Sequence, residues 1–264
     1  MLKVSDVYKT FNPGTVNKKT ALEDINLTLE EGDFVTLIGG NGSGKSTLLN
    51  CIAGVYTVDR GSIIIDNLDV TKMPEHKRAS TLGRVFQDPM VGTASNMVIE
   101  ENMALAFRRG DKRCLKWGIS RKERTLYKNI LSTLNLGLED RLGTKVGLLS
   151  GGQRQALTLL MATLKKPKLL LLDEHTAALD PRTAIKVLAL SDKIIEDNNL
   201  TALMVTHNMR DAIHHGNRLI MMYEGRILLD IKGDEKKKLT VEDLLDSFGR
   251  ASGKEFSNDR ALLS

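Results

Sequence analysis

A glycine-rich loop between a strand and a helix places the strongest constraint on how this chain folds. The loop reads Gly39-Gly40-Asn41-Gly42-Ser43-Gly44-Lys45-Ser46-Thr47 and follows the apolar, β-prone run Phe34–Ile38. Apolar residues at helical spacing come next, and Gly54 is expected to cap the helix: Leu48, Leu49, Ile52 and Ala53. Strand, glycine loop and helix in this order are typical of a loop that binds the phosphates of a nucleoside triphosphate.

The residue types in the loop suit phosphate. Glycines let successive backbone N–H groups turn toward the ligand, and the N-terminal end of the following helix adds positive charge. Lys45 is expected to contact the β- and γ-phosphates, and the Ser46 hydroxyl to bind Mg²⁺. The alternative, a glycine-rich turn that matches by chance, arises in roughly one chain of this length in a hundred.

Two further segments carry candidate chemistry. The run Leu169–Leu172 reads as a buried strand and ends in Asp173 and Glu174, at the edge where α/β sheets place ligands. Asp173 suits Mg²⁺ coordination, and Glu174 suits polarising an attacking water. The segment Leu149-Ser150-Gly151-Gly152-Gln153 opens a helical stretch and could grip phosphate, or could be only a capped helix start.

The rest of the chain indicates an α/β fold. The first thirty-odd residues alternate like an antiparallel β layer, with a turn at Asn12-Pro13-Gly14, and residues 96–136 have helical periodicity that reads as an insertion. Short strands at Ile63–Ile65, Val85-Phe86 and Ala202–Thr206, together with helices at Arg182–Asp197 and Met209–His214, predict a parallel sheet covered by helices. A hairpin is expected around Glu224-Gly225, and the tail after Gly249 is expected to be loosely held.

Composition and the length of apolar runs bear on the expected cellular location of the protein. The chain has 264 residues and only two cysteines, Cys51 and Cys114, which fits reduced thiols in structural roles. No apolar run reaches the length that crosses a bilayer, and no signal-peptide core is present, so residence in the cytoplasm is the default expectation.

Positive charge is concentrated in one segment. Residues 108–128 hold nine basic side chains against Asp111 and Glu123, within a chain of net charge +5. A solvated helical face is the favoured interpretation of this segment, and a face near anionic lipid or RNA is the alternative.

Glycine loop, LSGGQ and acid pair, in this order and spacing, resemble the nucleotide-binding subunits of ATP-binding cassette (ABC) transporters over about residues 2 to 230. Three smaller motifs extend the resemblance: Gln87 matches the Q-loop, Asp180 the D-loop and His207 the switch histidine. The resemblance implies that Phe11 stacks on adenine, with Tyr8 as the second candidate, although either ring could instead belong to the β-layer core. It also implies that Gln87 and His207 act in catalysis with Glu174, and that Gln87 joins Ser46 and Asp173 around Mg²⁺.

The resemblance further implies an ATPase with a P-loop NTPase core, an N-terminal antiparallel β layer and an inserted α-helical subdomain. The expected ATPase domain is 1–250, with the helical subdomain at roughly 88–164 and a polar tail at 251–264. Two cassettes, identical or paralogous, would meet head to tail, each ATP lying between one glycine loop and the other chain's residues Ser150, Gly151, Gly152 and Gln153. Expected partners are transmembrane permease subunits, which would hold the cassette at the cytoplasmic face of the membrane, and an extracytoplasmic substrate-binding protein. No nucleic acid is expected.

Departures from the family pattern refine this picture. His175 follows the catalytic glutamate where many cassettes have proline, and the helix after LSGGQ reads Arg154-Gln155-Ala156-Leu157 instead of the commoner version. These features are similar to bacterial importer cassettes that work with tryptophan- or tyrosine-type binding proteins. An exporter or lipoprotein-extraction ATPase, a soluble cassette acting on ribosomes or DNA, and a kinase or GTPase remain as alternatives.

Overall fold

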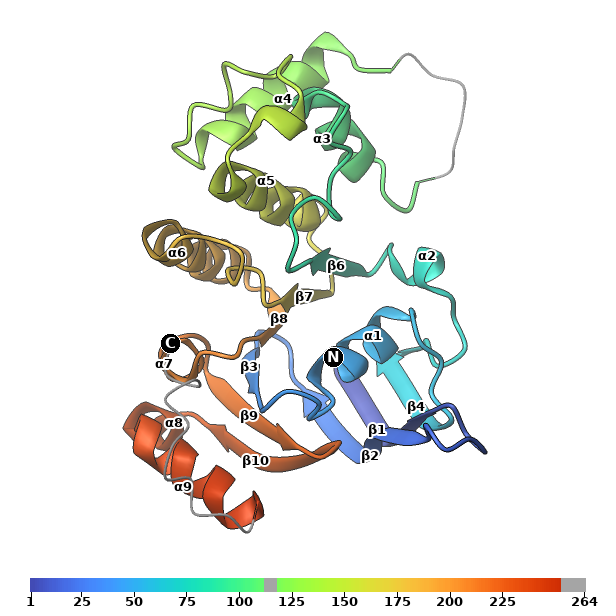
Figure 1. Cartoon of the computed structure of the whole chain (residues 1–264). Coiled ribbons are helices and arrows are strands. Elements are labelled where there is room, and N and C mark those ends of the chain that lie inside the picture. The colour runs from blue at the N-terminus through green and yellow to red at the C-terminus, as the bar shows by residue number, and fades with distance from the viewer. Residues whose placement is uncertain (112–117, 253–264) are drawn as a thin grey trace.

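The computed structural model describes residues 1–111 and 118–252, and it contains two β-sheets flanked by helices (Figure 1). One sheet is four-stranded and antiparallel, in the order β2-β1-β4-β5. The other is six-stranded and mostly parallel, in the order β10-β9-β3-β8-β7-β6. The predicted α/β class with an N-terminal antiparallel layer is confirmed.

The antiparallel sheet is built from alternating strands near the N-terminus. Its strands are β1 (Leu2–Phe11), β2 (Lys19–Leu29), β4 (Arg60–Ile65) and β5 (Leu68–Asp69). β1 and β2 pair from Leu2↔Leu29 to Phe11↔Lys19, and the predicted turn at residues 12–14 lies between them. The register places Phe11 and Lys19 directly opposite each other at the end of the ladder.

The central strands of the second sheet are short, apolar and buried, as expected for strands covered on both faces, whereas its last strand in the chain is an edge strand that alternates between exposed and half-buried residues. Its members are β3 (Phe34–Ile38), β6 (Leu82–Val85), β7 (Leu169–Asp173), β8 (Thr201–Val205), β9 (Arg218–Tyr223) and β10 (Arg226–Lys232). β3 runs parallel to β8 and β9, and β7 runs parallel to β6 and β8. The carboxyl ends of β3 and β7 therefore share one edge, where the glycine loop and the acid pair begin. The predicted strand at Val85-Phe86 ends one residue early, at Val85.

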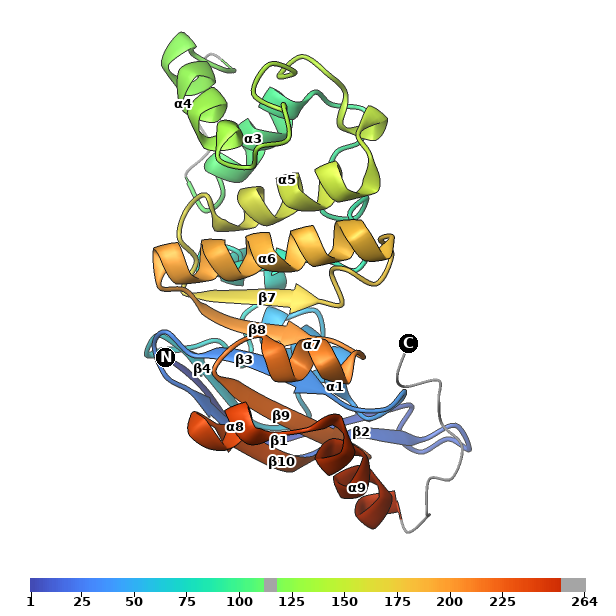
Figure 2. The same cartoon turned by 90° about the vertical axis from the view of Figure 1, so that its left-hand side faces the viewer.

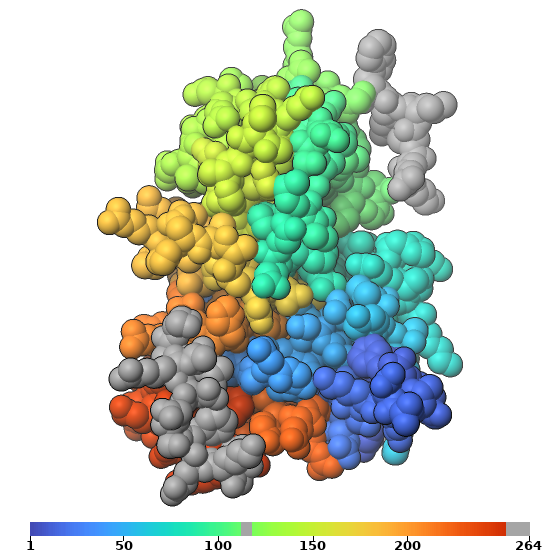
Figure 3. All heavy atoms as spheres, in the orientation of Figure 1, coloured from blue at the N-terminus to red at the C-terminus, as the bar shows by residue number. Residues whose placement is uncertain are grey.

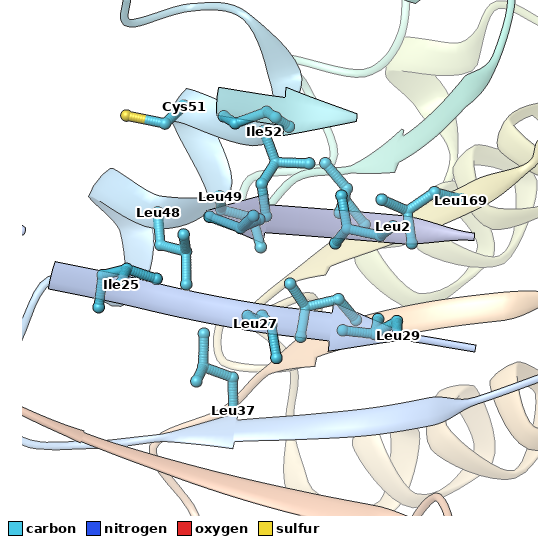
Figure 4. Packing of buried hydrophobic residues seen from close by; sticks show 14 of the residues in the cluster. Leu2, Ile25, Leu27, Leu29, Leu37, Leu48, Leu49, Cys51, Ile52 and Leu169 are labelled. Carbon is cyan, nitrogen blue, oxygen red and sulfur yellow. The ribbon is translucent and has the colours of Figure 1, made fainter. Parts of the chain in front are cut away.

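Helix α1 (Lys45–Ala53) joins the two sheets into one core. Leu48, Leu49 and Ile52 lie among buried residues of the strands, and Figure 4 shows them gathered with Leu2 and Leu27. Gly54 ends the helix in the left-handed conformation with φ 87°, as predicted. Cys51 is a buried free thiol, and Cys114 lies outside the described residues.

The helical region stands above the sheets in Figures 1 and 3 and has its own hydrophobic core. It contains α3 (Ile99–Phe107), α4 (Arg121–Ser132), a 3₁₀ turn (Val146–Leu148) and α5 (Gly151–Thr163). The prediction of helix throughout residues 96–136 is therefore wrong in detail. Residues 96–98 precede α3, and the chain leaves the helix at Arg108, followed by Gly110 in a turn with φ 79°.

Helix α6 (Pro181–Asn198) lies beside α5 and covers β7 and β8, as Figure 2 shows. The shorter α7 (Met209–His214) follows β8 and packs against β3. Both helices were predicted to within two residues. A further short helix, α2 (Glu75–Arg78), precedes β6.

The chain ends in two helices that were not predicted, α8 (Asp234–Lys238) and α9 (Val241–Ser252). Leu244 and Phe248 of α9 are buried against β9. Because α9 continues to Ser252, the residues just after Gly249 are helical, and the expectation of a loose tail from that point is wrong. Residues 253–264 of the expected tail lie outside the described residues. Within residues 1–111 and 118–252, no helix is both long and apolar enough to cross a membrane.

Candidate functional site

An open pocket lies where the glycine loop meets the antiparallel sheet. It is lined by Phe11, Lys19, Ala21, Asn41, Gly42, Ser43, Gly44, Lys45, Ser46, Thr47 and Glu174. Most of the predicted loop and one of the two predicted carboxylates thus face a common space. Gly39 and Gly40, also predicted, begin the loop and are not among the lining residues.

The N-terminus of α1 has no side-chain cap, so its N–H groups can donate hydrogen bonds to a bound ligand. Gly44 caps the helix with φ 104° and supplies no side chain to its N–H groups. A Cβ atom at this position would lie 2.5 Å from the Ala21 carbonyl oxygen, so a larger residue would strain the loop as well as crowd β2. The Ser43 hydroxyl is buried and has no hydrogen-bond partner in the part of the chain that the structure describes. Unsatisfied donors at a helix N-terminus favour an anion.

Lys45 is buried at the base of the pocket with 6% of its surface exposed. Its ammonium donates hydrogen bonds to the carbonyls of Gly39 at 2.7 Å and Gly40 at 3.1 Å. Burial lowers the pKa of Lys45, and the carboxylates of Glu174 and Asp173 oppose that effect. A cation held among loop carbonyls and two acids is well placed to receive phosphate, which is a stronger acceptor than a carbonyl.

Asp173 is held by a residue that the sequence did not single out. Arg84 of β6 donates to the Asp173 carboxylate at 3.3 Å and to the Asn50 side-chain oxygen at 2.8 Å. Burial raises the pKa of Asp173, while Arg84 acts in the opposite direction. The adjacent strands β6 and β7 bring the two side chains together across the ladder, which no local sequence pattern could indicate.

Glu174 turns out of β7 with φ 43°, a left-handed conformation that is uncommon for a non-glycine residue. Its backbone N–H donates to the Val205 carbonyl at 3.0 Å, which ties it to β8. The His207 Nδ1 atom lies 3.7 Å from the Glu174 carboxylate. Two residues that lie 33 positions apart in the sequence, and that were predicted to act together, are therefore neighbours.

His175 is buried, with 2% exposure, between the loop after β7 and α6. Its Nε2 atom lies 2.9 Å from the Ser191 hydroxyl, which itself donates to the Val187 carbonyl. Because the single hydroxyl proton is used there, His175 donates from Nε2 and Nδ1 carries no proton. Burial lowers the pKa of His175 to about 4, with His215 adding to that shift. His175 is thus a neutral, buried side chain that anchors the loop after β7 to α6.

The LSGGQ segment has a capped helix start, which was the alternative interpretation. The Ser150 hydroxyl accepts from the Gln153 N–H at 3.3 Å, and the Gln153 side chain accepts from the Ser150 N–H at 3.2 Å. Gly152 packs so closely on α6 that a Cβ atom would lie 2.2 Å from Thr183. None of the four residues 150–153 lines the pocket of its own chain.

Phe11 is half-buried and lies on the rim of the pocket with the edge of Tyr56 against it, at a centroid distance of 5.3 Å. Tyr8 does not line the pocket and instead lies under the Arg60 guanidinium. The pocket favours Phe11 over Tyr8 as the aromatic residue that meets a base. Its stacking role stays a prediction.

The remaining predicted residues lie outside the pocket lining. Gln87 is exposed two residues beyond β6. Asp180 caps α6 by accepting from the Thr183 N–H at 3.1 Å, and hydrogen bonds from the Thr183 side chain and backbone lower the pKa of Asp180. The pocket lining also contains Lys19 and Ala21, which sequence reasoning missed because only the β1–β2 register brings them to the loop.

Most of the described basic side chains of residues 108–128 are exposed, whereas Arg109 is half-buried and donates to the Ala162 carbonyl at 3.1 Å. Arg108 pairs with Glu123 at 2.7 Å, and Arg124 pairs with Glu100 at 2.7 Å. These intramolecular pairs use part of the positive charge. Lys112, Arg113, Lys116 and Trp117 lie outside the described residues.

The residues present fit a nucleoside triphosphate with Mg²⁺. The open helix N-terminus, the partnerless Ser43 hydroxyl and the Lys45 ammonium suit phosphate oxygens. The exposed Ser46 hydroxyl and the Asp173 carboxylate are hard oxygen donors of the kind that Mg²⁺ prefers.

Comparison with known proteins agrees with this site. The family model described as ABC transporter matches residues 22–177, a span that contains the glycine loop, LSGGQ and the acid pair. A tyrosine transport ATP-binding protein of Clostridioides difficile (strain R20291) is 45% identical over 248 residues, which cover 94% of this chain and 98% of that protein. A phosphonates import ATP-binding protein of Lactococcus lactis subsp. lactis (strain IL1403) is 32% identical and covers 92% of this chain and 98% of its own length.

Solved structures show the same architecture. A dimeric, post-hydrolysis ATP-binding cassette bound to ADP and Pi matches with a TM-score of 0.73 and 32% identity, over 88% of this chain and 98% of that one. The ADP conformation of a second cassette matches with a TM-score of 0.76 and 26% identity, over 94% and 98% of the two chains. The resemblance drawn from the motifs is confirmed, including the similarity to a tyrosine-type relative.

Proposed function

This chain belongs to the ABC transporter family, whose ATP-binding cassettes hydrolyse ATP to power transport, and we propose that it is the ATPase subunit of a bacterial importer of amino acids or similar small solutes. The observation that carries this proposal is the 45% identity, over almost the full length of both chains, with a protein named for tyrosine transport. Other similar relatives are named for the import of phosphonates and methionine. Family membership excludes the kinase and GTPase alternatives.

Cassettes of this family dimerise and work with transmembrane permease subunits. For this chain we propose a head-to-tail pair, in which each ATP lies between the glycine loop of one chain and Ser150 to Gln153 of the other. The separation of Ser150 from the pocket of its own chain supports this arrangement, because phosphate donors at α5 would otherwise have no ligand to meet. Closure of a second surface would exclude water and add donors around the γ-phosphate.

The residues of one chain divide the work. Lys45, the glycine-loop N–H groups and Phe11 would bind the nucleotide. Ser46, Asp173 and Gln87 would hold Mg²⁺, which neutralises phosphate charge when bound. Glu174 would orient and polarise the attacking water, and His207, 3.7 Å away, would hold the Glu174 carboxylate and sense the γ-phosphate.

We further propose that the cassette sits at the cytoplasmic face of the membrane through its permease and that an extracytoplasmic binding protein delivers the solute. Co-purification of the tagged chain from membranes tests this. An importer predicts a polytopic permease together with a secreted or lipid-anchored binding protein. Recovery of ribosomal proteins, or of a permease that functions without a binding protein, would instead support the soluble or exporter alternative.

Replacing Glu174 by Gln tests the enzymatic assignment. The amide keeps the shape of the side chain but cannot polarise water, so turnover should fall by roughly 10²- to 10⁴-fold while MgATP binding is retained. Glu224→Gln is the matched control, because Glu224 has a similar φ of 45° but lies in an exposed hairpin turn. Normal hydrolysis by Glu174→Gln would show that the catalytic carboxylate lies elsewhere.

A further inference from the structure

Lys19 is a cation in the nucleotide pocket for which the family motifs provide no role. It begins β2, pairs in register with Phe11 and lines the pocket beside the glycine loop. Its ammonium lies 3.5 Å from the position that a Cβ atom of Gly42 would occupy. Lys19 therefore reaches from the antiparallel sheet to the outer turn of the phosphate-binding loop.

Two other cations near this sheet edge are neutralised by acidic side chains of the chain. Lys9 lies 2.9 Å from the Asp59 carboxylate, and Arg226 lies 2.6 Å from Glu23. In residues 1–111 and 118–252, no acidic side chain forms an ion pair with Lys19. An unpaired ammonium on a pocket wall is free to pair with a ligand anion.

Lys19 is positioned by the antiparallel sheet, whereas the acid pair belongs to the other sheet. Lys19 pairs with Phe11 in the β1–β2 register, and its ammonium faces Gly42 of the glycine loop. Asp173 ends β7 of the six-stranded sheet, and Glu174 follows it. Lys19 is therefore placed with Phe11 and Gly42, at the nucleotide-binding side of the pocket.

From this placement we propose that Lys19 is a nucleotide-binding residue that pairs with the phosphates common to ATP and ADP. This inference rests on the proposed binding of ATP by the glycine loop. It predicts a contribution to the affinity for both nucleotides and no contribution to the chemical step. Lys45, by contrast, is expected to favour ATP over ADP because it meets the γ-phosphate.

The test compares Lys19→Met with Lys18→Met in the full-length chain. Methionine keeps the length of the side chain and removes the charge, and Lys18 is the adjacent exposed lysine outside the pocket lining, so both variants lose the same charge. Calorimetric titration with MgADP and with the Mg²⁺ complex of a non-hydrolysable ATP analogue measures Kd. Lys19→Arg serves as the conservative variant that restores the charge.

Lys19→Met should weaken both nucleotides by the same factor, roughly three- to tenfold at low salt, and the loss should shrink as salt rises. Lys18→Met should bind like the parent, and Lys19→Arg should recover most of the affinity. Equal affinities of Lys19→Met and Lys18→Met would overturn the assignment, as would a loss confined to the ATP analogue. If the parent bound neither nucleotide, the proposed function itself would fail, which is a separate outcome.

Discussion

Helices α1 and α5 both begin in glycine-containing segments, but their N-termini are capped in opposite ways. At α1 the N-cap is Gly44, which offers no side chain, and the nearby Ser43 hydroxyl is left without a partner. At α5 the N-cap is Ser150, whose hydroxyl and backbone are both engaged by Gln153. The first start opens onto a pocket with Lys45 and Glu174, and the second is exposed and lines no part of that pocket.

This difference in capping matches the different roles proposed for α1 and α5 in nucleotide binding. A helix start that leaves its donors open can bind phosphate within its own chain, since the anion completes the hydrogen bonds. A helix start that caps itself is satisfied without a ligand, which fits the proposed head-to-tail pair, in which α5 of one chain meets the nucleotide of the other. The absence of a side chain at Gly152 lets α5 lie close against Thr183 of α6, because a Cβ atom there would lie 2.2 Å from the Thr183 methyl group.

The largest expected effects come from one substitution at each helix N-terminus, Lys45→Ala at α1 and Ser150→Arg at α5. Lys45→Ala should weaken MgATP binding and lower turnover by ~10²- to 10³-fold, because it removes a stabilising charge at the phosphates. Ser150→Arg should lower turnover by a similar factor yet leave the Kd of the isolated chain unchanged, since Ser150 lies outside the pocket. Steady-state hydrolysis and equilibrium titration at low protein concentration measure the two quantities. Equal weakening of binding by both variants would contradict the comparison.

His175 links the two regions, because it anchors the loop after Glu174 to α6, on which α5 rests. Its pKa is lowered from 6.5 to about 4 by burial, so the folded protein favours the neutral ring. This contribution to stability is complete above pH 6.5 and is lost as the pH falls toward 4. The shift corresponds to about 3 kcal/mol in the free energy of unfolding.

His175→Phe should flatten that acid dependence, because the ring can no longer be protonated. Urea unfolding at several pH values between 7 and 4.5 measures it. His76→Gln is the control, since that side chain is exposed and should leave the pH slope unchanged. Parallel curves for the parent and His175→Phe would show that another group governs the acid response.

The smallest effect concerns the base end of the pocket. Phe11→Ala should weaken MgATP binding by the ~1 to 3 kcal/mol of a base stacked on an aromatic ring, with less effect on turnover at saturating ATP. Tyr8→Ala is the control, because Tyr8 lies outside the pocket lining. Adenine specificity should be shallow. If Phe11→Ala binds ATP and GTP as the parent does, Phe11 belongs to the packing of Tyr56 and not to nucleotide binding.

The local pattern of apolar residues and glycines in the sequence predicted most of the fold. Strand β3, the glycine loop and α1 were readable because an apolar run, a set of glycines and helical spacing follow one another directly. Helix α9 was missed although Val241, Leu244, Leu245 and Phe248 have helical spacing, and the polar residues after Gly249 favoured a loose tail. The break after α3 was missed because charged residues continue past Gly110 without interrupting the periodicity.

The site was predicted where its residues are consecutive and missed where they are assembled by pairing. Lys19 reaches the pocket through the β1–β2 register, and Arg84 reaches Asp173 across two adjacent strands. The burial of His175 depends on Ser191, which is sixteen residues away on α6. Such contacts follow from the packed structure, and no spacing in the sequence encodes them.

The most direct measurement combines two defective chains. Differently tagged Lys45→Ala and Ser150→Arg chains are purified as a heterodimer, and ATP hydrolysis and nucleotide-dependent dimer closure are both recorded. In a head-to-tail pair one site carries both defects, but the other joins an intact Lys45 to an intact Ser150 from the opposite chain. The account predicts that this dimer closes on ATP and, provided that a single site can hydrolyse, turns over well above either homodimer. A heterodimer no better than the homodimers in both assays would show that Ser150 acts on the nucleotide of its own chain, which would contradict the account.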